Sequence, residues 1–415
     1  DGTHDPTTDG LPDVPVDPAW DPGPRPDADA SPDPGIDPDQ DIPWDFPADA
    51  WNEVLVPEGE GTIFEPESGE YITSESCWGS RCAAFSGSVY EVIMQENTPW
   101  NGDSEFVGVY RLVPGGSVLG TSWIDATPDL SESGTQLCWT GEVFLVLLPT
   151  ETQGVRVLSV NVSGELVRPV ETLDTNGQCT VLCPSEGPFI VESSSSWTDL
   201  DIIHLLRPDG SFENIRIETS LPMSMVPRHE LCVEAGAEAA CLSDRSITFL
   251  RRDGTYRQSD EITGFEDYLF NRDIAYTGSG IALVWSDYID DFSKAYMYYV
   301  LWDMDGRVVV PPRPVAMAQD HLSVGSSGST LLVFGGGGYF DTPPRVLLLA
   351  MDGTLLDGPM PAAGRYDITF WGALGVFWEG DAYALLWNTW PDEYILYRRF
   401  HVCLLYTSDA ADEED

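Results

Sequence analysis

The sequence has few basic residues. Its 415 residues include 20 lysines and arginines against 69 aspartates and glutamates, and Lys294 is the only lysine. With a formal net charge of −49, the chain lacks the basic surface that displaces counterions from phosphates, so we expect it to bind no nucleic acid. The same charge disfavours docking on anionic lipid. Apolar runs long enough to cross a bilayer are also absent, so we expect no transmembrane segment.

Recognisable catalytic motifs are missing as well. None of the five histidines stands in an HExxH or a Gly-x-Ser-x-Gly context. The glycine run at residues 335–338 lacks the lysine and the following helix of a phosphate-binding loop. These patterns assign no catalytic residue, so an enzyme is an alternative rather than the first expectation.

Residues 1–50 lack the apolar content of a folded segment. They contain 14 aspartates and 12 prolines, with aspartate at every fourth position from Asp1 to Asp49 except at Arg25. Proline at this density prevents a helix, and the composition cannot bury enough apolar surface to offset chain entropy. We therefore expect a disordered, self-repelling acidic tether ahead of the folded region.

Calcium is the only cofactor for which the tether offers a pattern. Four closely spaced carboxylates crudely match a calcium-binding loop: Asp37, Asp39, Asp41 and Asp45. The glycine turn and the terminal bidentate glutamate of an EF-hand are missing. We therefore predict no specific metal or cofactor site, with calcium as the alternative.

The start of the chain also bears on its location. Residue 1 is aspartate rather than methionine and no signal peptide is present, so we expect a mature form or a fragment. An Asp/Pro tract ahead of a folded domain resembles the tether behind the lipid-bearing cysteine of bacterial surface lipoproteins, particularly those of myxobacteria. The resemblance implies an extracytoplasmic protein at the cell surface or secreted, lipid-anchored before residue 1.

The last residues resemble something other than a natural protein. Residues 403–413, Cys-Leu-Leu-Tyr-Thr-Ser-Asp-Ala-Ala-Asp-Glu, are similar to the translation of a transposase-based sequencing adapter over eleven consecutive positions. The resemblance implies that residues 403–415 are a non-native tail and that the natural protein was cut near Val402. On this interpretation Cys403 takes no part in a disulfide.

Glycine turns between apolar strands recur through the middle of the chain. In one series the glycines lie 44–52 residues apart: Gly116, Gly164, Gly210, Gly254, Gly306 and Gly353. A second series, out of phase with the first, has spacings of 44–54 residues: Gly87, Gly141, Gly187, Gly236, Gly280, Gly328 and Gly380. Turns of this kind join antiparallel strands. Two interleaved series with one shared period indicate a repeated structural unit.

The repeated unit predicts one four-stranded antiparallel blade: strand, glycine turn, strand, loop, strand, glycine turn, strand. Seven copies fit residues 51–402, which therefore resemble a seven-bladed β-propeller. No blade carries a WD, Asp-box or kelch signature, so the resemblance covers architecture only. The seventh copy ends at Val402 without an outer strand, so we expect an incomplete last blade unless residues 61–64 or 70–73 supply that strand.

The cysteines cluster in the first four blades. Their spacing suggests three local pairs: Cys77 with Cys82, Cys179 with Cys183, and Cys232 with Cys241. Cys138 is left over, and a bridge between blades from Cys138 to Cys179 is an alternative, so the connectivity stays open. Structural disulfides favour an oxidising, extracytoplasmic compartment.

One predicted loop concentrates polar and aromatic side chains. Between the middle strands of the fifth blade lie these ligand-binding candidates: Trp285, Asp287, Tyr288, Asp290 and Asp291. A glycosidase would need two carboxylates facing each other across a sugar, and a calcium site would need converging oxygens. A solvated acidic loop needs neither arrangement.

These patterns together predict an all-β protein that acts as a non-catalytic binding or scaffold module at the bacterial cell surface. We expect a monomer whose partner is an unidentified protein or glycan. The alternative is a hydrolase or lyase that acts on polysaccharide through carboxylates at the mouth of the propeller channel. The two differ in whether acidic side chains converge with an arginine or a tyrosine in one concave pocket.

Overall fold

The computed structural model describes residues 55–64, 82–97, 105–124, 135–150, 154–175, 178–193, 201–219, 231–243, 245–263, 270–289, 294–317, 321–336, 344–362, 369–390 and 395–403. The predicted tether at residues 1–50 and the tail beyond Cys403 lie outside these ranges. All the strands belong to the unit Trp44–Asp415, and its described residues form no helix. The all-β prediction is confirmed.

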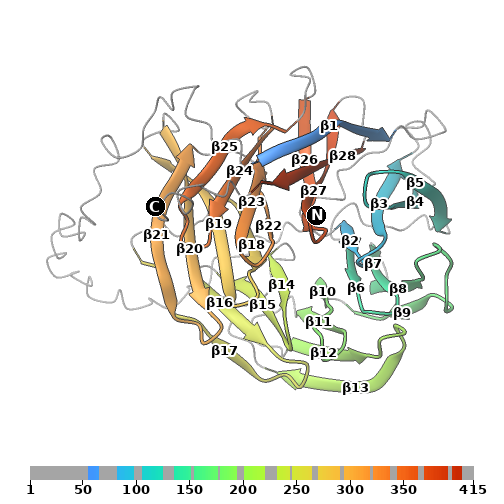
Figure 1. Ribbon diagram of the computed structural model, residues 1–415. Coiled ribbons are helices and arrows are strands. Elements are labelled where there is room, and N and C mark those ends of the chain that lie inside the picture. The colour runs from blue at the N-terminus through green and yellow to red at the C-terminus, as the bar shows by residue number, and fades with distance from the viewer. Residues whose placement is uncertain are drawn as a thin grey trace, which may run out of the picture. The chain divides into compact units, whose positions relative to one another are not determined.

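Seven four-stranded antiparallel sheets surround a central axis and form the blades of a β-propeller (Figure 1). Blade 1 is β2 (Ala83–Phe85), β3 (Tyr90–Asn97), β4 (Glu105–Leu112) and β5 (Val118–Ile124). Blade 2 is β6 (Gln136–Trp139), β7 (Phe144–Thr150), β8 (Gly154–Val160) and β9 (Glu171–Leu173). Blade 3 is β10 (Gln178–Leu182), β11 (Phe189–Ser193), β12 (Asp201–Leu206) and β13 (Phe212–Thr219). Blade 4 is β14 (Cys232–Ala235), β15 (Glu238–Ser243), β16 (Ser246–Leu250) and β17 (Tyr256–Gln258).

The remaining three blades complete the ring. Blade 5 is β18 (Phe270–Tyr276), β19 (Gly280–Ile289), β20 (Lys294–Asp303) and β21 (Val308–Met317). Blade 6 is β22 (Ser323–Ser326), β23 (Thr330–Gly335), β24 (Arg345–Ala350) and β25 (Leu355–Pro361). Blade 7 is β26 (Thr369–Trp378), β27 (Ala382–Trp390), β28 (Ile395–Val402) and β1 (Leu55–Phe64). The first strand of each blade contacts the first strands of its neighbours, so these seven strands line the centre.

Both glycine series lie at the same end of the propeller. In an antiparallel blade the first and third turns fall on one side and the second on the other, so we call the side with the glycine turns the tight-turn face. All six glycines of the first series have φ between 78° and 84°, which L-residues rarely adopt. In blade 5 the left-handed turn residue is Gly278 rather than the predicted Gly280, which instead begins β19.

The core consists of side chains packed between adjacent blades. Between blades 5 and 6, for example, Met297 and Tyr299 pack in one cluster with Leu331 and Val333. Five glycines of the first series fit against the preceding blade: Gly164, Gly210, Gly254, Gly306 and Gly353. A Cβ on Gly353, for example, would collide with the ring of Tyr299. Packing between blades therefore adds a second reason for glycine in these turns.

The ring closes through the N-terminal strand, so the expected incomplete blade is in fact complete. β1 pairs antiparallel with β28, from Leu55 opposite Val402 to Phe64 opposite Ile395. Residues 61–64, one of the two predicted donors, thus lie in the outer strand of blade 7. The closure leaves the sheet of blade 7 with the same four-stranded form as the others, and protects β28 from being an open edge.

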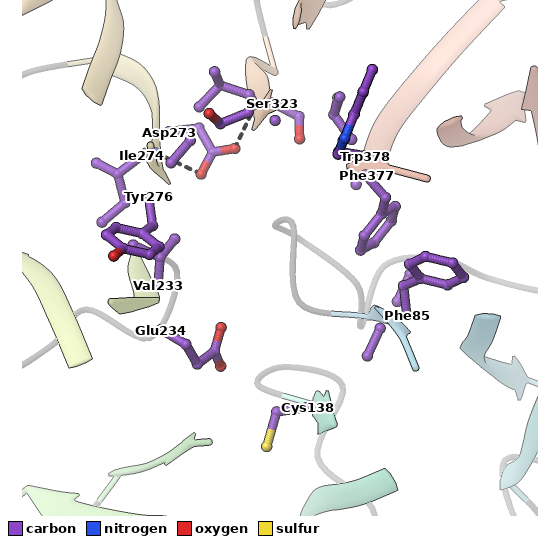
Figure 2. A pocket seen from close by; sticks show the side chains of 18 of the residues that line it. Phe85, Cys138, Val233, Glu234, Asp273, Ile274, Tyr276, Ser323, Phe377 and Trp378 are labelled. Atoms are coloured by element: carbon purple, nitrogen blue, oxygen red, sulfur yellow. Dashed lines mark hydrogen bonds between the residues drawn. The ribbon is translucent and has the colours of Figure 1, made fainter. Parts of the chain in front are cut away.

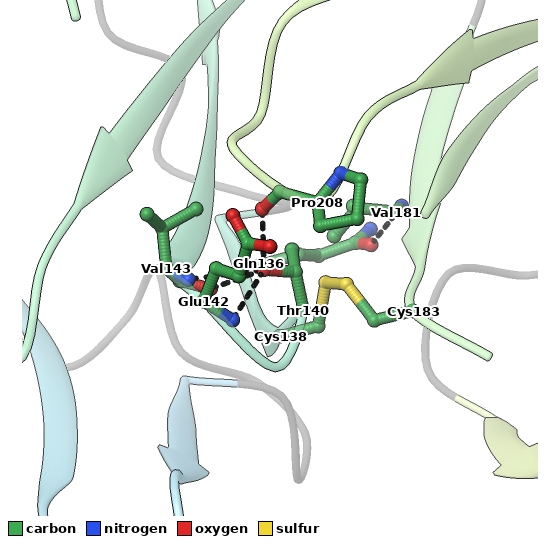
Figure 3. Close-up of a disulfide and its surroundings, with 8 residues drawn as sticks. All are labelled: Gln136, Cys138, Thr140, Glu142, Val143, Val181, Cys183 and Pro208. Atoms are coloured by element: carbon green, nitrogen blue, oxygen red, sulfur yellow. Dashed lines mark hydrogen bonds between the residues drawn. A yellow bond between two sulfur atoms is a disulfide. The ribbon is translucent and has the colours of Figure 1, made fainter. Parts of the chain in front are cut away.

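Two disulfides have both cysteines among the described residues. Cys232 pairs with Cys241, facing it across the β14–β15 hairpin as the spacing suggested. Cys138 pairs with Cys183, so the disulfide joins blades 2 and 3 (Figure 3). This pairing corrects both the Cys179–Cys183 and the Cys138–Cys179 expectations, and it leaves Cys179 as a buried cysteine outside the disulfides. Cys82 is disulfide-bonded, whereas its candidate partner Cys77 lies outside the described residues.

Gln136 explains why Cys183 rather than Cys179 meets Cys138. Its side-chain amide donates to the carbonyl of Cys179 at 3.1 Å and accepts from the amide of Val181 at 3.0 Å. The side chain thereby fixes the register between the two inner strands (Figure 3). Cys138, two residues further along β6, then lies beside Cys183.

We predict that the double variant Cys138→Ser, Cys183→Ser loses about 2–4 kcal/mol of unfolding free energy, the usual effect of removing a disulfide. The control Cys179→Ser should change it by less than about 1 kcal/mol, because no cross-link is lost. Denaturant unfolding without reductant measures both. Peptide mapping that found Cys179 in a disulfide would contradict the assignment.

Candidate functional site

The main candidate site is a cavity in the propeller channel. Its volume is about 490 Å³, within the usual range of small-molecule sites. Its lining comes from the inner strands β2, β6, β14, β18, β22 and β26, together with Cys183 at the end of β10. All seven blades therefore contribute, so the cavity depends on the closed ring.

Aromatic rings mark the mouth of this cavity. They come from four positions around the channel: Phe85, Trp139, Tyr276 and the neighbouring Phe377 and Trp378. All are at or near the last residue of their inner strand, and each strand runs directly into a tight turn. The rings therefore lie toward the tight-turn face, and all are only partly buried.

Several of these rings are held in place by residues of the second strands. Phe85 stacks on Tyr90 with ring centroids 4.3 Å apart, and Trp378 meets Tyr383 edge-on at 4.9 Å. Trp139 likewise packs on Phe144 at 4.6 Å. The rings at the mouth are thus supported from behind by the core, which limits their freedom before any ligand arrives.

Two carboxylates line the cavity, and they play different parts. Asp273 is 4% exposed, and its two oxygens accept hydrogen bonds from the backbone amides of Ile274 at 2.9 Å and Val324 at 2.8 Å. It therefore ties β18 to β22 of the next blade. Glu234 on β14 is exposed, and its side chain points into the open centre of the channel (Figure 2).

The remaining polar group of interest is a serine hydroxyl. Ser323 is 1% exposed and lies in the cavity lining, and no hydrogen-bond partner for its Oγ occurs among the described residues. A polar group of a ligand that reached this depth could satisfy it. Within the described part of the chain, no three carboxylate, imidazole or thiol groups lie close enough to hold a metal ion.

Among the ligand-binding candidates predicted in blade 5, Trp285 and Asp287 do not line this cavity. Trp285 is fully buried and stacks on Tyr298 at 5.4 Å, so it is a core residue rather than a ligand contact. Asp287 belongs to β19 opposite Tyr296 and is half-buried, rather than lying in a loop. The side chain of Tyr288 and all of Asp290 and Asp291 lie outside what the structure describes.

Burial disfavours reactivity of the Cys179 thiol. Burial is the main cause that raises the pKa of Cys179 to about 12, and the charge of Glu192 adds to it. A nucleophilic cysteine needs its thiolate, so this thiol is inert at neutral pH. His204 on β12 pairs at 2.9 Å with Glu192 on the neighbouring strand β11 of the same blade, and neither residue lines the channel cavity.

Glu91 is a buried carboxyl that the sequence did not single out. It is 0% exposed on β3 opposite Arg111, and no hydrogen-bond partner for either oxygen occurs among the described residues. Burial raises the pKa of Glu91 from 4.5 to about 8, and the Arg111 charge offsets this only in part. The folded state therefore holds a proton that the unfolded chain releases above pH 4.5.

We predict a stability that falls as pH rises from about 4.5 to 8, because the native state binds the proton more tightly over that window. The slope from this one group is at most about 1.4 kcal/mol per pH unit. Glu91→Gln should remove that slope and be more stable than the wild type at pH 8, with the advantage shrinking toward pH 4.5. Chemical unfolding across pH 4.5–8 tests this. Parallel curves for the two proteins would show that Glu91 titrates normally.

Comparison with known proteins agrees with the β-propeller fold and gives no information on function. No family model and no curated protein matches the chain. Among solved structures, a streptogramin B lyase is 10% identical with a TM-score of 0.47, covering 84% of this chain and 98% of the other. The β-propeller domain of the Trilobed protease from Pyrococcus furiosus is 8% identical with a TM-score of 0.45, covering 79% and 97%. The Pan2 WD40 domain of Neurospora crassa is 11% identical with a TM-score of 0.46, covering 72% and 86%.

These structures differ in activity as their names state, and their identity to this chain is far below the level at which function is shared. In the described part of the chain we find no helix with the length and apolarity needed to cross a membrane. The function therefore has to be argued from the channel itself.

Proposed function

We propose that this protein is an extracytoplasmic, non-catalytic binding module that takes its ligand at the aromatic mouth of the channel. The observation that carries the proposal is the 490 Å³ cavity with partly exposed rings from blades 1, 2, 5 and 7. Aromatic faces bind the apolar faces of sugars and peptides, and a rigid, concave arrangement keeps the ordering cost low.

The arrangement of carboxylates favours binding over hydrolysis. Polysaccharide hydrolysis of the usual kind needs a pair of carboxyl groups across the substrate. In the described lining, Asp273 is held by two backbone amides, which leaves Glu234 as the exposed carboxylate. A hydrolase or lyase remains the alternative proposal, and release of reducing ends or unsaturated products from a polysaccharide panel would support it.

The location belongs to the same proposal. Disulfides between and within blades are typical of proteins in oxidising compartments, and they are compatible with the cell surface or secretion. The Asp/Pro tract supports a tethered, lipid-anchored form, and we propose a monomer with a protein or glycan partner.

The test is capture on arrays of glycans and peptides by labelled protein. Tyr276→Ala removes a ring at the mouth, and Tyr256→Ala removes one that is 40% exposed on the outer strand β17. We expect capture to fall about tenfold or more in Tyr276→Ala and to be unchanged in Tyr256→Ala, as expected for an aromatic contact at a binding site. Equal capture by both variants would place the binding site elsewhere.

A further inference from the structure

The lining of the channel cavity carries negative and aromatic groups but no positive one. Among the described residues that line it there is no lysine, arginine or histidine. In residues 51–402 acidic side chains outnumber basic ones 50 to 19, so basic residues are scarce but present. No described lining residue would therefore repel a cation in this cavity.

The rings at the mouth are suited to cations as well as to apolar groups. The face of an aromatic ring is negative, and a cation over the face of tryptophan, tyrosine or phenylalanine is attracted to it. Tryptophan gives the strongest attraction, and the mouth contains two, Trp139 and Trp378. Several rings around one space form the type of cage that binds alkylated ammonium groups.

Glu234 adds a full negative charge at the same place. Its carboxylate projects from β14 toward the open centre, with Tyr276 on one side and Phe85 and Phe377 across the channel (Figure 2). Since the neighbouring Asp273 is already hydrogen-bonded to the backbone, Glu234 is the carboxylate that a ligand can pair with. The net charge of the chain strengthens the attraction at long range and steers cations toward the protein.

We propose that the tight-turn mouth binds an organic ammonium group, with Glu234 as its counter-ion and the rings as its walls. The group belongs either to a free small amine or to a lysine side chain on a polypeptide. This inference rests on the proposed binding function and names the class of ligand for it. A cavity of about 490 Å³ has room for such a group and the atoms attached to it.

The test compares pairs of probes that differ in charge but not in shape. Choline and 3,3-dimethyl-1-butanol have the same outline, with nitrogen replaced by carbon in the second. The peptide pair is the Nα-acetyl methylamide of lysine and that of 2-aminoheptanoic acid, in which a methyl group replaces the ammonium group. Isothermal titration at low salt should show each cation binding about tenfold or more tightly than its neutral partner, and added salt should reduce the difference.

Two glutamine variants separate the site from the overall charge. Glu234→Gln should weaken binding of the cation about tenfold, with little change for the neutral probe. Glu142→Gln makes the same charge change at an exposed turn residue of blade 2 that does not line the cavity, and it should change affinity less than twofold. Equal loss in the two variants, or none in either, would overturn the inference.

The outcomes also distinguish this inference from the proposed function. Capture of a neutral glycan that depends on Tyr276, together with no binding of either ammonium probe, would overturn the inference and leave the binding function standing. If no glycan, peptide or ammonium probe binds at the channel, both the proposed binding function and the ammonium inference are overturned. If the ammonium class binds, preference for choline indicates a free small amine and preference for the lysine amide indicates a polypeptide.

Discussion

Removing residues 1–64 is expected to unfold the propeller, whereas removing residues 1–50 is expected to leave its thermal midpoint unchanged. The first truncation deletes β1, which provides the outer strand of blade 7. Leu55, 2% exposed in the core beside Tyr383 and Phe400, would be lost with it. The second truncation removes only the predicted tether.

The strand also makes hydrogen bonds with buried polar groups of blades 6 and 7. The amide of Leu55 donates to Asp357 of blade 6 at 2.8 Å, and Asp357 is 5% exposed. Arg398, 7% exposed, donates to the carbonyl of Gly59 at 2.7 Å. Each such loss costs about 1–3 kcal/mol, so together with the buried leucine and the ladder to β28 the total reaches about 5 kcal/mol or more. That equals the whole stability of many domains.

Circular dichroism melts and size-exclusion chromatography measure the result. The 1–64 truncation should be unfolded or aggregated, because β28 becomes an open edge. A peptide of residues 51–64 added in trans should restore folding by pairing with that edge. A midpoint within a few degrees of the wild type would show that β1 is dispensable for closure.

Glu379→Met is expected to cost about 3–5 kcal/mol of unfolding free energy, because it removes the partner of three groups at the joint between blades 7 and 1. The hydroxyls of Tyr90 and Tyr397 donate to Glu379 Oε1 at 2.6 and 2.7 Å. Arg399 forms an ion pair with Oε2 at 2.7 Å. The Glu379 side chain is 2% exposed, so water cannot replace it.

The hydroxyls of Tyr90 and Tyr397 stay protonated well above neutral pH and so remain hydrogen-bond donors. Burial first, and the Glu379 carboxylate second, raise the pKa of Tyr90 and of Tyr397 well above the usual 10. Both hydroxyls therefore keep their protons and their hydrogen bonds to Glu379. The joint between blades 7 and 1 is held by these bonds in addition to apolar packing.

Glu58→Met is the matched control, because Glu58 pairs with the same Arg399 at 2.9 Å but is 52% exposed. Its loss should cost less than about 1 kcal/mol, the usual range for an exposed ion pair. Urea unfolding of the two variants measures the difference. Similar costs for both would mean that burial of Glu379 contributes nothing beyond an ordinary surface pair.

Local sequence patterns predicted the blades well because the glycine turns and the apolar strands are short-range features. The turn at Gly210 needs a left-handed residue whatever surrounds it, and so does the turn at Gly353. The Cys232–Cys241 disulfide could likewise be predicted from the sequence, because the two residues face each other in one hairpin. The prediction of a loop around Asp287 failed because β19 continues to Ile289, four residues beyond Trp285, where the hydrophobic pattern ends.

The candidate site was harder to predict because its members are far apart in the chain. Trp139 and Trp378 are far apart in the sequence, in blades 2 and 7. Nothing in the sequence around either residue indicates that they line one cavity. Trp285 has the same residue type and a similar local pattern, yet it is buried in the core. The useful signal is position: an aromatic residue at the end of a first strand, directly before a glycine turn, points to the channel mouth.

The sequence by itself determined the repeat, the strand order within each blade and the places of the turns, because each depends on residues within about 50 positions of one another. Tertiary structure alone decided the Cys138–Cys183 bridge, the closure by β1, the burial of Glu379 and the composition of the channel mouth. All four depend on how one blade meets another. A repeat of similar length and pattern can specify its own fold, but the contacts between copies form only when the ring closes.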